Sequence, residues 1–347
     1  MFNSLIVKNF KSINSLRLDS LARINLFFGK NNCGKTTILE AIFLMTGISN
    51  PELFRRCNNF RSYNHISDLA YFFHDLAVEN DIELSSTGDS SLYDRNAKIS
   101  FSKLEKKQIQ ASTIKEGLIS NSTETSILTI TSSVGDVKFK SSFTLGFLKN
   151  GERNTIKIPK NYQEKIDCYY LPPRIAFENI PNMVQKIFED KEEKMVVEAL
   201  QLFDARIKDF AFANNDVMVD VGFKKRIPIN LLGDGVRKFF TLVLAIYCSK
   251  NGVLIVDEID NGLHFSSMET LWCIIFKVAE QFNVQLFITT HNIDSLKGLK
   301  KVIDAEETYK SSVSFYKLIH RQNDVNEALY YNSGNFSTVI EQENEIR

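Results

Sequence analysis

Residues 24–36, INLFFGKNNCGKT, decide the fold of this chain. Five mostly apolar residues lead into Gly29, and the run from Gly29 to Thr36 has the spacing GxxxxGK[ST] of a phosphate-binding loop. Residues 36–47, TTILEAIFLMTG, then place apolar residues at helical spacing, and Gly47 is suited to end that helix. Because a strand, a glycine loop and a helix are the context that such a loop requires, we prefer this interpretation to a chance glycine turn.

The side chains of this loop predict a site for ATP and Mg²⁺. Glycines allow the backbone to point its N–H groups at phosphate oxygens, and the helix that follows directs the positive end of its dipole at them. Lys35 supplies a positive charge for the β- and γ-phosphates, and the Thr36 hydroxyl is a ligand suited to Mg²⁺. The predicted nucleotide-binding residues of the loop are Gly29, Asn31, Asn32, Cys33, Gly34, Lys35, Thr36 and Thr37.

A second motif, VLIVDE at residues 253–258, consists of four apolar residues followed by two carboxylates. A buried strand can hold Asp257 beside the metal ion, and Glu258 can accept a proton from the water that attacks the γ-phosphate. His291 ends another apolar strand, where its ring can hydrogen-bond the γ-phosphate. The alternative, ordinary acids at a strand end and a structural histidine, is less favoured because the chain also carries the glycine loop. The predicted catalytic residues are therefore Lys35, Glu258 and His291, and the predicted metal ligands are Thr36 and Asp257.

A second glycine-rich segment, LGDGVR at residues 232–237, opens a long apolar helix. Glycines at a helix start form another anion-binding terminus. Because the chain already has one phosphate-binding loop, we predict that Gly233, Asp234 and Gly235 close over the γ-phosphate of a second copy. A simple loop-to-helix turn remains the open alternative.

The composition is that of an ordinary globular protein. The chain has 347 residues, 44% of them hydrophobic, and a formal net charge of zero, so its overall charge favours neither nucleic acid nor an anionic membrane as a partner. The N-terminus lacks the features of a signal peptide, and the longest apolar runs are too short to span a bilayer. The five cysteines are scattered without a CxxC pair, which favours a cytoplasmic protein without a zinc site or disulfides.

The elements between these motifs predict an α/β protein with an insertion. We interpret residues 4–18 as one opening strand, residues 82–158 as an antiparallel β arm, and residues 181–210 as helical. The segments after the second glycine motif alternate between strands and helices, as in a parallel sheet. The predicted divisions are an ATPase lobe at 1–85, a β-rich arm at 86–170, a helical insertion at 171–215, a second ATPase lobe at 216–300 and C-terminal edge strands at 301–347.

Taken together, the motifs resemble those of the ABC ATPase superfamily and, within it, the SMC/RecF/OLD-like branch. NFKS at residues 9–12 is similar to the start of that branch. Small bacterial AAA-type ABC proteins related to OLD ATPases are closer still, with GDG at 233–235, DEIDNGLH at 257–264 and TTH at 289–291. The resemblance implies an ABC-type P-loop NTPase fold with an antiparallel β arm and an inserted helical subdomain. It also implies ATP hydrolysis in a head-to-tail dimer that encloses ATP between two copies.

The resemblance adds residues to the predicted site and shows one departure. Lys11 and Ser12 join the nucleotide-binding residues, and Asp260 fits the D-loop position. The usual signature LSGGQ is LGDGV here, so the serine that would contact the partner's phosphate is missing. His264 follows closely enough to lie near the site, whereas His65, His74 and His320 have no such context and are interpreted as structural.

The resemblance also suggests a biological role. Stand-alone ATPases of this group often work with a separate effector, frequently a TOPRIM-type nuclease, in anti-phage defence or toxin–antitoxin systems. We therefore expect a dimerising ATPase that acts as a switch, sensor or scaffold and controls a nuclease or toxin, with no membrane partner. The stretch after His291 is too short for a nuclease domain, so we expect no nuclease activity in this chain.

Two other functions stay open at this point. One is a RecF-like DNA-binding ATPase in DNA repair, against which the neutral charge and the GDG signature argue. The other is the ATP-binding subunit of a transporter, which neither the signature nor the N-terminus supports.

Overall fold

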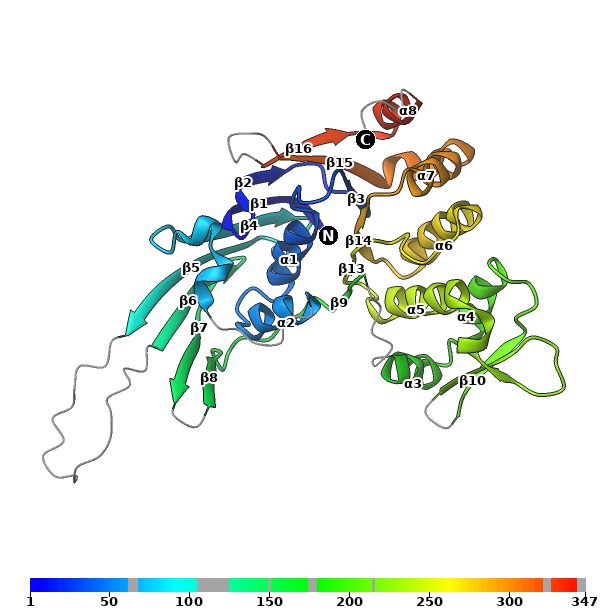
Figure 1. Cartoon of the computed structure of the whole chain (residues 1–347), viewed down its shortest axis with the longest axis horizontal. Coiled ribbons are helices and arrows are strands. Elements are labelled where there is room, and N and C mark those ends of the chain that lie inside the picture. The colour runs from blue at the N-terminus through cyan, green and yellow to red at the C-terminus, as the bar shows by residue number, and fades with distance from the viewer. Residues whose placement is uncertain are drawn as a thin grey trace, which may run out of the picture.

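The computed structural model describes residues 1–61, 68–104, 125–148, 151–173, 180–213, 216–320 and 326–341. Two sheets dominate these residues, and Figure 1 shows them with α1 and α2 on one side of the molecule and α3 to α7 on the other. The predicted α/β class is confirmed. The central sheet consists, in spatial order, of β16 (Asn326–Tyr331), β15 (Val313–His320), β3 (Ile24–Phe28), β14 (Gln285–Thr290), β13 (Val253–Val256) and β9 (Cys168–Leu171).

The central sheet is parallel from β15 to β9, and only β16 runs antiparallel. Every residue of β3, β13 and β14 is buried, as expected where both faces of a parallel sheet are covered. Because the carboxyl ends of parallel strands meet at one edge, the segments that follow β3, β13 and β14 come together there. This edge carries the glycine loop, the paired carboxylates and the histidine found in the sequence.

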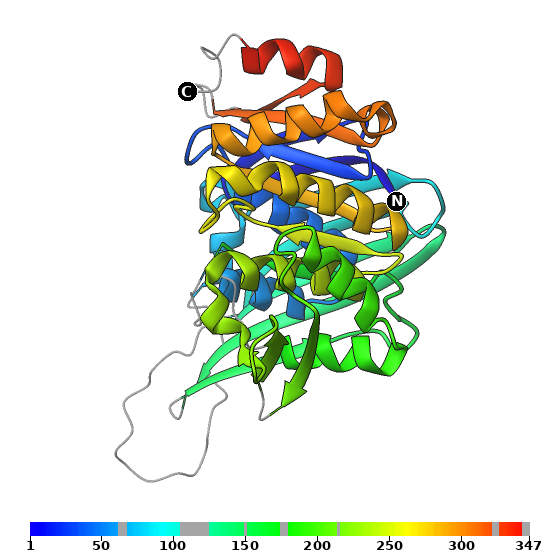
Figure 2. The same cartoon turned by 90° about the vertical axis from the view of Figure 1, so that its right-hand side faces the viewer.

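Two apolar cores cover the two faces of the central sheet. The first is formed by helices that pack on the face opposite the glycine-loop helix, as Figure 2 shows from the side. The second lies between α1, the central sheet and the antiparallel sheet. The helices of the first core include α3 (Ile180–Asp190), α5 (Asp234–Cys248), α6 (Met268–Gln281) and α7 (Ile293–Ala305), and those of the second include α1 (Lys35–Thr46) and α2 (Glu52–Phe60).

The antiparallel sheet continues the N-terminal strands into the predicted arm. Its strands are, in spatial order, β2 (Ile13–Leu18), β1 (Phe2–Phe10), β4 (Ile82–Gly88), β5 (Arg95–Leu104), β6 (Thr125–Val134), β7 (Val137–Leu148) and β8 (Gly151–Lys157). β4 spans the predicted division between 85 and 86 and pairs with both β1 and β5. The single strand predicted for residues 4–18 is wrong, because β1 and β2 form a hairpin. Its turn places Lys11 at φ 49°, and a lysine in this conformation gives none of the glycine or asparagine signals by which turns are predicted.

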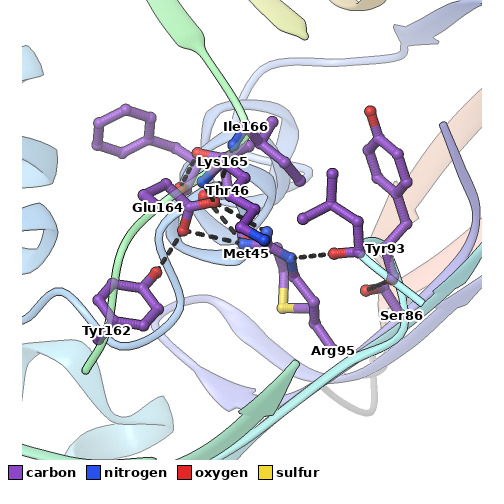
Figure 3. A network of polar contacts seen from close by, with 11 residues as sticks. Met45, Thr46, Ser86, Tyr93, Arg95, Tyr162, Glu164, Lys165 and Ile166 are labelled. Atoms are coloured by element: carbon purple, nitrogen blue, oxygen red, sulfur yellow. Dashed lines mark hydrogen bonds and ion pairs between the residues drawn. The ribbon is translucent and has the colours of Figure 1, made fainter. Parts of the chain in front are cut away.

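A buried arginine joins this sheet to the glycine-loop helix (Figure 3). Arg95 in β5 is 1% exposed, and its guanidinium donates hydrogen bonds to the carbonyls of Met45 (2.8 Å) and Thr46 (3.0 Å) at the end of α1. It also pairs with Glu164 at 2.9 Å, in the segment that leads to β9, and the Tyr162 hydroxyl donates to the same carboxylate. Because the last carbonyls of a helix have no partner within it, a cation there is favourable. Arg95 thus ties the sheet, α1 and the segment before β9 together.

The inserted segment is less helical than its sequence predicts. The segment 181–210, interpreted as helical, contains two helices, because α3 ends before Lys191, which has φ 60°, and α4 (Glu193–Gln201) begins after it. Residues 209–213 form a strand, β10 (Asp209–Ala213), in a small sheet with β11 (Asp216–Asp220) and β12 (Ile227–Pro228).

The C-terminal segment contributes both strands and helices. β16 lies at the sheet edge, whereas β15 lies inside it, between β16 and β3. A last helix, α8 (Ser333–Glu341), packs on β15. Within the described part of the chain, no helix has the length and apolar character needed to cross a membrane.

Candidate functional site

The loop after β3 adopts a conformation that needs glycine at two positions. Gly29 has φ 143°, and a Cβ there would lie 2.5 Å from the carbonyl oxygen of Leu318. Gly34 has φ 93° and directly precedes α1. Any other residue at either position would strain the backbone, and at Gly29 it would also collide with β15.

A cavity of about 520 Å³ opens over this loop. The side chain of Lys35 is 9% exposed, and its Nζ donates hydrogen bonds to the carbonyls of Gly29 (2.8 Å) and Lys30 (2.7 Å). A single positive charge is therefore held inside the curve of the loop. The residues that line the cavity are Lys11, Ser12, Asn31, Asn32, Gly34, Lys35, Thr36, Thr37, Arg61 and Glu258. Cys33 is not among them; it is buried, and this burial raises the pKa of its thiol although Lys35 opposes the effect.

Thr36 and Asp257 are in direct contact. The Thr36 hydroxyl donates a 2.8 Å hydrogen bond to Oδ2 of Asp257, which is 4% exposed. Thr289 in β14 donates its hydroxyl to Oδ1 of the same carboxylate and accepts a 2.8 Å hydrogen bond from the backbone N–H of Glu258. One threonine hydroxyl, in the TTH motif but not among the predicted site residues, therefore positions both acids.

His291 lies beside Glu258, but only Glu258 is among the described residues that line the cavity. Nδ1 of His291 lies 3.8 Å from Oε1 of Glu258, and both side chains are partly exposed. The backbone of Glu258 has φ 53°, a left-handed conformation that is unfavourable for residues other than glycine. Such strain persists only where surrounding contacts enforce it, as the Thr289 hydrogen bond does here.

Lys238 is a further residue of the site that sequence reasoning missed. It lies on α5, is 8% exposed, and its Nζ donates to the backbone carbonyls of Glu258 (3.3 Å) and Asn261. Burial lowers the pKa of this ammonium group to about 8, against the opposing charges of Asp260 and Glu258. In the sequence it is one lysine inside a long apolar helix, which offers no local signal.

A buried carboxylate holds two cations at the other end of the cavity. Glu40 on α1 is fully buried and pairs with Nζ of Lys11 at 3.0 Å and with Nε of Arg61 at 2.7 Å. The hydroxyl of Thr37 is hydrogen-bonded to the Ser12 hydroxyl at 2.9 Å and accepts from Arg61 at 3.3 Å. Lys11 and Ser12 were predicted to lie at the site, whereas Glu40 and Arg61 were not.

The second glycine motif lies outside this cavity. Gly233 has φ 94° and precedes α5, whereas Asp234 is largely exposed and pairs with Arg237 at 3.1 Å. None of the three predicted residues, Gly233, Asp234 and Gly235, is among the described residues that line the cavity.

Two further predicted residues also lie apart from the cavity lining. Asp260 is buried and accepts a hydrogen bond of 2.5 Å from Thr290. The ring of His264 contacts that of Phe265 in a tilted arrangement and hydrogen-bonds the Ser266 hydroxyl at 2.9 Å. The ring of His74 hydrogen-bonds the Lys11 carbonyl at 2.9 Å, and His65 lies outside the described residues.

Comparison with known proteins covers most of the chain. A family profile described as "AAA ATPase domain" matches residues 1–172, and a second, described as "AAA domain, putative AbiEii toxin, Type IV TA system", matches residues 168–296. The first match contains the glycine loop, and the second contains Glu258 and His291. Both profiles describe AAA-type ATPase domains, and the chain is a P-loop ATPase.

A curated protein and two solved structures are similar to this ATPase over most of its length. An "ATP/GTP phosphatase" of Helicobacter pylori is 26% identical over 87% of this chain and 88% of its own length. The structure of an SMC head bound to the C-terminal winged-helix domain of ScpA covers 97% of this chain and 99% of that chain, with 12% identity and a TM-score of 0.51. At that identity the likeness shows the fold. The SMC head domain from Thermotoga maritima is 11% identical, with a TM-score of 0.47 and coverage of 95% and 99%.

Proposed function

We propose that this ATPase is a dimerising switch that controls a separate effector, a nuclease or toxin, in bacterial anti-phage defence. The observation that carries the proposal is the separation of the glycine helix start at Gly233 from the cavity over Lys35. A site whose second anion-binding terminus lies outside its own cavity can be completed by another copy of the chain. ATP then acts as the link between two copies, and its hydrolysis releases them.

The cavity residues suit the chemistry of phosphoryl transfer to water. In this proposal Lys35 binds the β- and γ-phosphates, with the loop N–H groups around it. Thr36 and Asp257 present a hydroxyl and a carboxylate oxygen side by side, the hard oxygen ligands that suit Mg²⁺. When bound, this ion neutralises phosphate charge. Glu258 accepts the proton of the attacking water, and His291, 3.8 Å away, hydrogen-bonds the γ-phosphate.

The helix that begins after Gly233 also contacts the loop that carries Glu258. Lys238, one turn further along α5, donates hydrogen bonds to the carbonyls of Glu258 and Asn261. A partner's phosphate that binds at the start of α5 therefore acts on a helix in contact with the loop of its own chain. Binding of a partner's phosphate at the start of α5 can therefore change the position of Glu258 in the same chain. Such coupling between two sites is the property that a switch needs.

Support for an effector comes from the comparisons. The description of the second matching profile names a toxin of a type IV toxin–antitoxin system. The related SMC head is bound to a domain of ScpA, a separate protein. For this chain we infer a partner that binds one nucleotide state of the dimer.

Phage challenge of cells that express the protein together with the products of its neighbouring genes tests this role. Wild type should protect the cells, whereas Lys35→Ala should not, because the phosphates lose the cation of the loop. Equal protection by wild type and Lys35→Ala, at equal protein levels, would show that ATP does not operate the switch.

A second candidate, a DNA-binding ATPase of the RecF type, is favoured by one surface. The exposed face of the antiparallel sheet carries Lys138, Lys140 and Lys157 on adjacent strands. Ser133 and Thr131 are the cross-strand neighbours of Lys138 and Lys140. Lysines and hydroxyls are common phosphate ligands. DNA binding that weakens steeply with salt in wild type, and is lost in a Lys138→Glu, Lys140→Glu variant, would support this candidate over the first.

A further inference from the structure

A second cavity adjoins the one over the glycine loop. It measures about 360 Å³ and shares two lining residues, Lys11 and Arg61, with the first cavity. These two cations therefore stand between the cavities. The remaining described residues that line it are Asn58, Tyr71, Phe73, Asp75 and Leu76.

Asn58 brings an unused amide to this second cavity. The residue is 8% exposed and lies near the end of α2. Its backbone carbonyl accepts a 3.0 Å hydrogen bond from the N–H of Arg61, but its side-chain amide has no hydrogen-bond partner among the residues that the structure describes. The Asn58 amide is not among the buried polar atoms that lack a partner, so it opens into the cavity although most of the residue is covered. Its donor and its acceptor are therefore both available to a ligand that enters the cavity.

Two large apolar side chains stand beside this amide. Tyr71 is 51% exposed and Leu76 is 55% exposed, although both line the same cavity. Asp75 and Leu76 have φ values of 48° and 59°, so two consecutive residues other than glycine adopt a left-handed conformation at the cavity wall. Such conformations gather at sites that clamp a ligand. A flat aromatic ligand would cover the exposed ring of Tyr71 and the side chain of Leu76.

The charges between the cavities suit a ligand with a phosphate at one end. Glu40 neutralises one of the two positive charges of Lys11 and Arg61, so the pair keeps one positive charge. Both cations are fixed from α1, the helix that begins with Lys35. A molecule that places its terminal phosphates over the glycine loop would pass Lys11 and Arg61 before it reaches Asn58.

We propose that the second cavity binds the base of the nucleotide and that Asn58 selects adenine. An asparagine amide can accept a hydrogen bond from N6 of adenine and donate one to N7. Guanine presents two acceptors on this edge, O6 and N7, so the carbonyl of the amide would face another acceptor. Tyr71 and Leu76 then cover the faces of the ring. This inference rests on the nucleotide site proposed above and adds base selection to it.

Hydrolysis of ATP and GTP by wild type, Asn58→Leu and Asn59→Leu tests the proposal. Wild type should prefer ATP in kcat/KM, and Asn58→Leu should reduce that preference on the order of tenfold to a hundredfold, mainly through KM. Asn59 lies next to Asn58 on the same helix but is exposed, so Asn59→Leu should keep the wild-type ratio. An unchanged ratio in Asn58→Leu would overturn the assignment.

ATP analogues with the unaltered protein remove any dependence on folding of the variant. Binding of 7-deaza-ATP, which lacks N7, and of purine riboside triphosphate, which lacks the N6 amino group, should be at least severalfold weaker than that of ATP. Binding equal to that of ATP would overturn the role of Asn58.

Tripolyphosphate separates failure of this inference from failure of the phosphate site. Its binding should be lost in Lys35→Ala and unchanged in Asn58→Leu. If Lys35→Ala abolishes binding while every base is treated alike, only the base assignment is wrong. If Lys35→Ala binds all ligands like wild type, the underlying nucleotide site is wrong as well.

Discussion

The hydroxyl of Thr36 donates a 2.8 Å hydrogen bond to Oδ2 of Asp257, although 221 positions separate the two residues. The contact exists because β3 and β13 both flank β14, so the loops that follow them meet at one edge of the central sheet. Thr289, at the end of β14, completes the arrangement by binding the other carboxylate oxygen. The proposed ligands for Mg²⁺ are thus positioned by three adjacent strands.

The role of Thr289 can be tested by removing its hydroxyl. Thr289→Val keeps the shape of the side chain but leaves Oδ1 of Asp257 and the N–H of Glu258 without their partner. We expect kcat for ATP to fall about 10- to 100-fold, as is usual when a residue that orients metal ligands is lost. Thr46→Val is the control, since that hydroxyl lies at the end of α1 away from the glycine loop, where it donates to the Phe43 carbonyl at 2.7 Å. Equal kcat in Thr289→Val and wild type would contradict this role.

The buried Lys238 predicts a specific dependence of stability on pH. Its pKa is about 8 in the folded protein and 10.5 in the unfolded chain, so the unfolded chain binds more protons between these values. The free energy of unfolding contributed by this group therefore rises with pH from about 8 to 10, by up to about 1.4 kcal/mol per pH unit. Urea unfolding of wild type and Lys238→Met at pH 7.5, 8.5 and 9.5 measures the difference. The free energy of unfolding of wild type should rise relative to that of the variant as pH rises. A constant or opposite difference would show that Lys238 is not a buried ammonium group with a lowered pKa.

The Arg95 network should matter for stability far more than surface ion pairs. Arg95→Met would remove the cation paired with Glu164 and the donor to the carbonyls of Met45 and Thr46, which we expect to lower the free energy of unfolding by about 3–5 kcal/mol. Arg17→Met is the matched control, because Arg17 and its partner Asp19 are both exposed. It should leave the free energy of unfolding almost unchanged, because water screens an exposed ion pair. Urea denaturation of both variants measures the two losses in free energy of unfolding. Equal losses would show that Arg95 does not stabilise the end of α1.

The parts of the site that lie in continuous motifs were predictable from sequence. Residues 29–36 and 253–258 each combine a buried strand with the residues that follow it, so the local pattern identifies both element and position. The parallel order of the strands then brings Lys35, Asp257 and Glu258 together without further information. The antiparallel arm was also predictable, because its strands alternate in polarity.

The missed residues reach the site only through tertiary packing. Glu40, Arg61 and Lys238 lie on helices or at their ends, where a charged side chain normally faces solvent and gives no signal. The hairpin at Lys11 and the helix break at Lys191 were missed for a related reason. Both residues adopt positive φ, and lysine has no local preference for that conformation; neighbouring elements impose it.

Association of Glu258→Gln in the presence of ATP tests the central claim, a site completed by a second copy. The substitution keeps the size of the side chain but removes the proposed base, so hydrolysis should fall about 100-fold or more while ATP still binds. The retained γ-phosphate should hold two copies together at the helix starts that carry Gly233 and Gly235. Light scattering should therefore show ATP-dependent dimers or larger assemblies, and Gly235→Glu, added to Glu258→Gln, should abolish them. ATP-bound Glu258→Gln whose association does not change well above micromolar concentration would contradict the composite site.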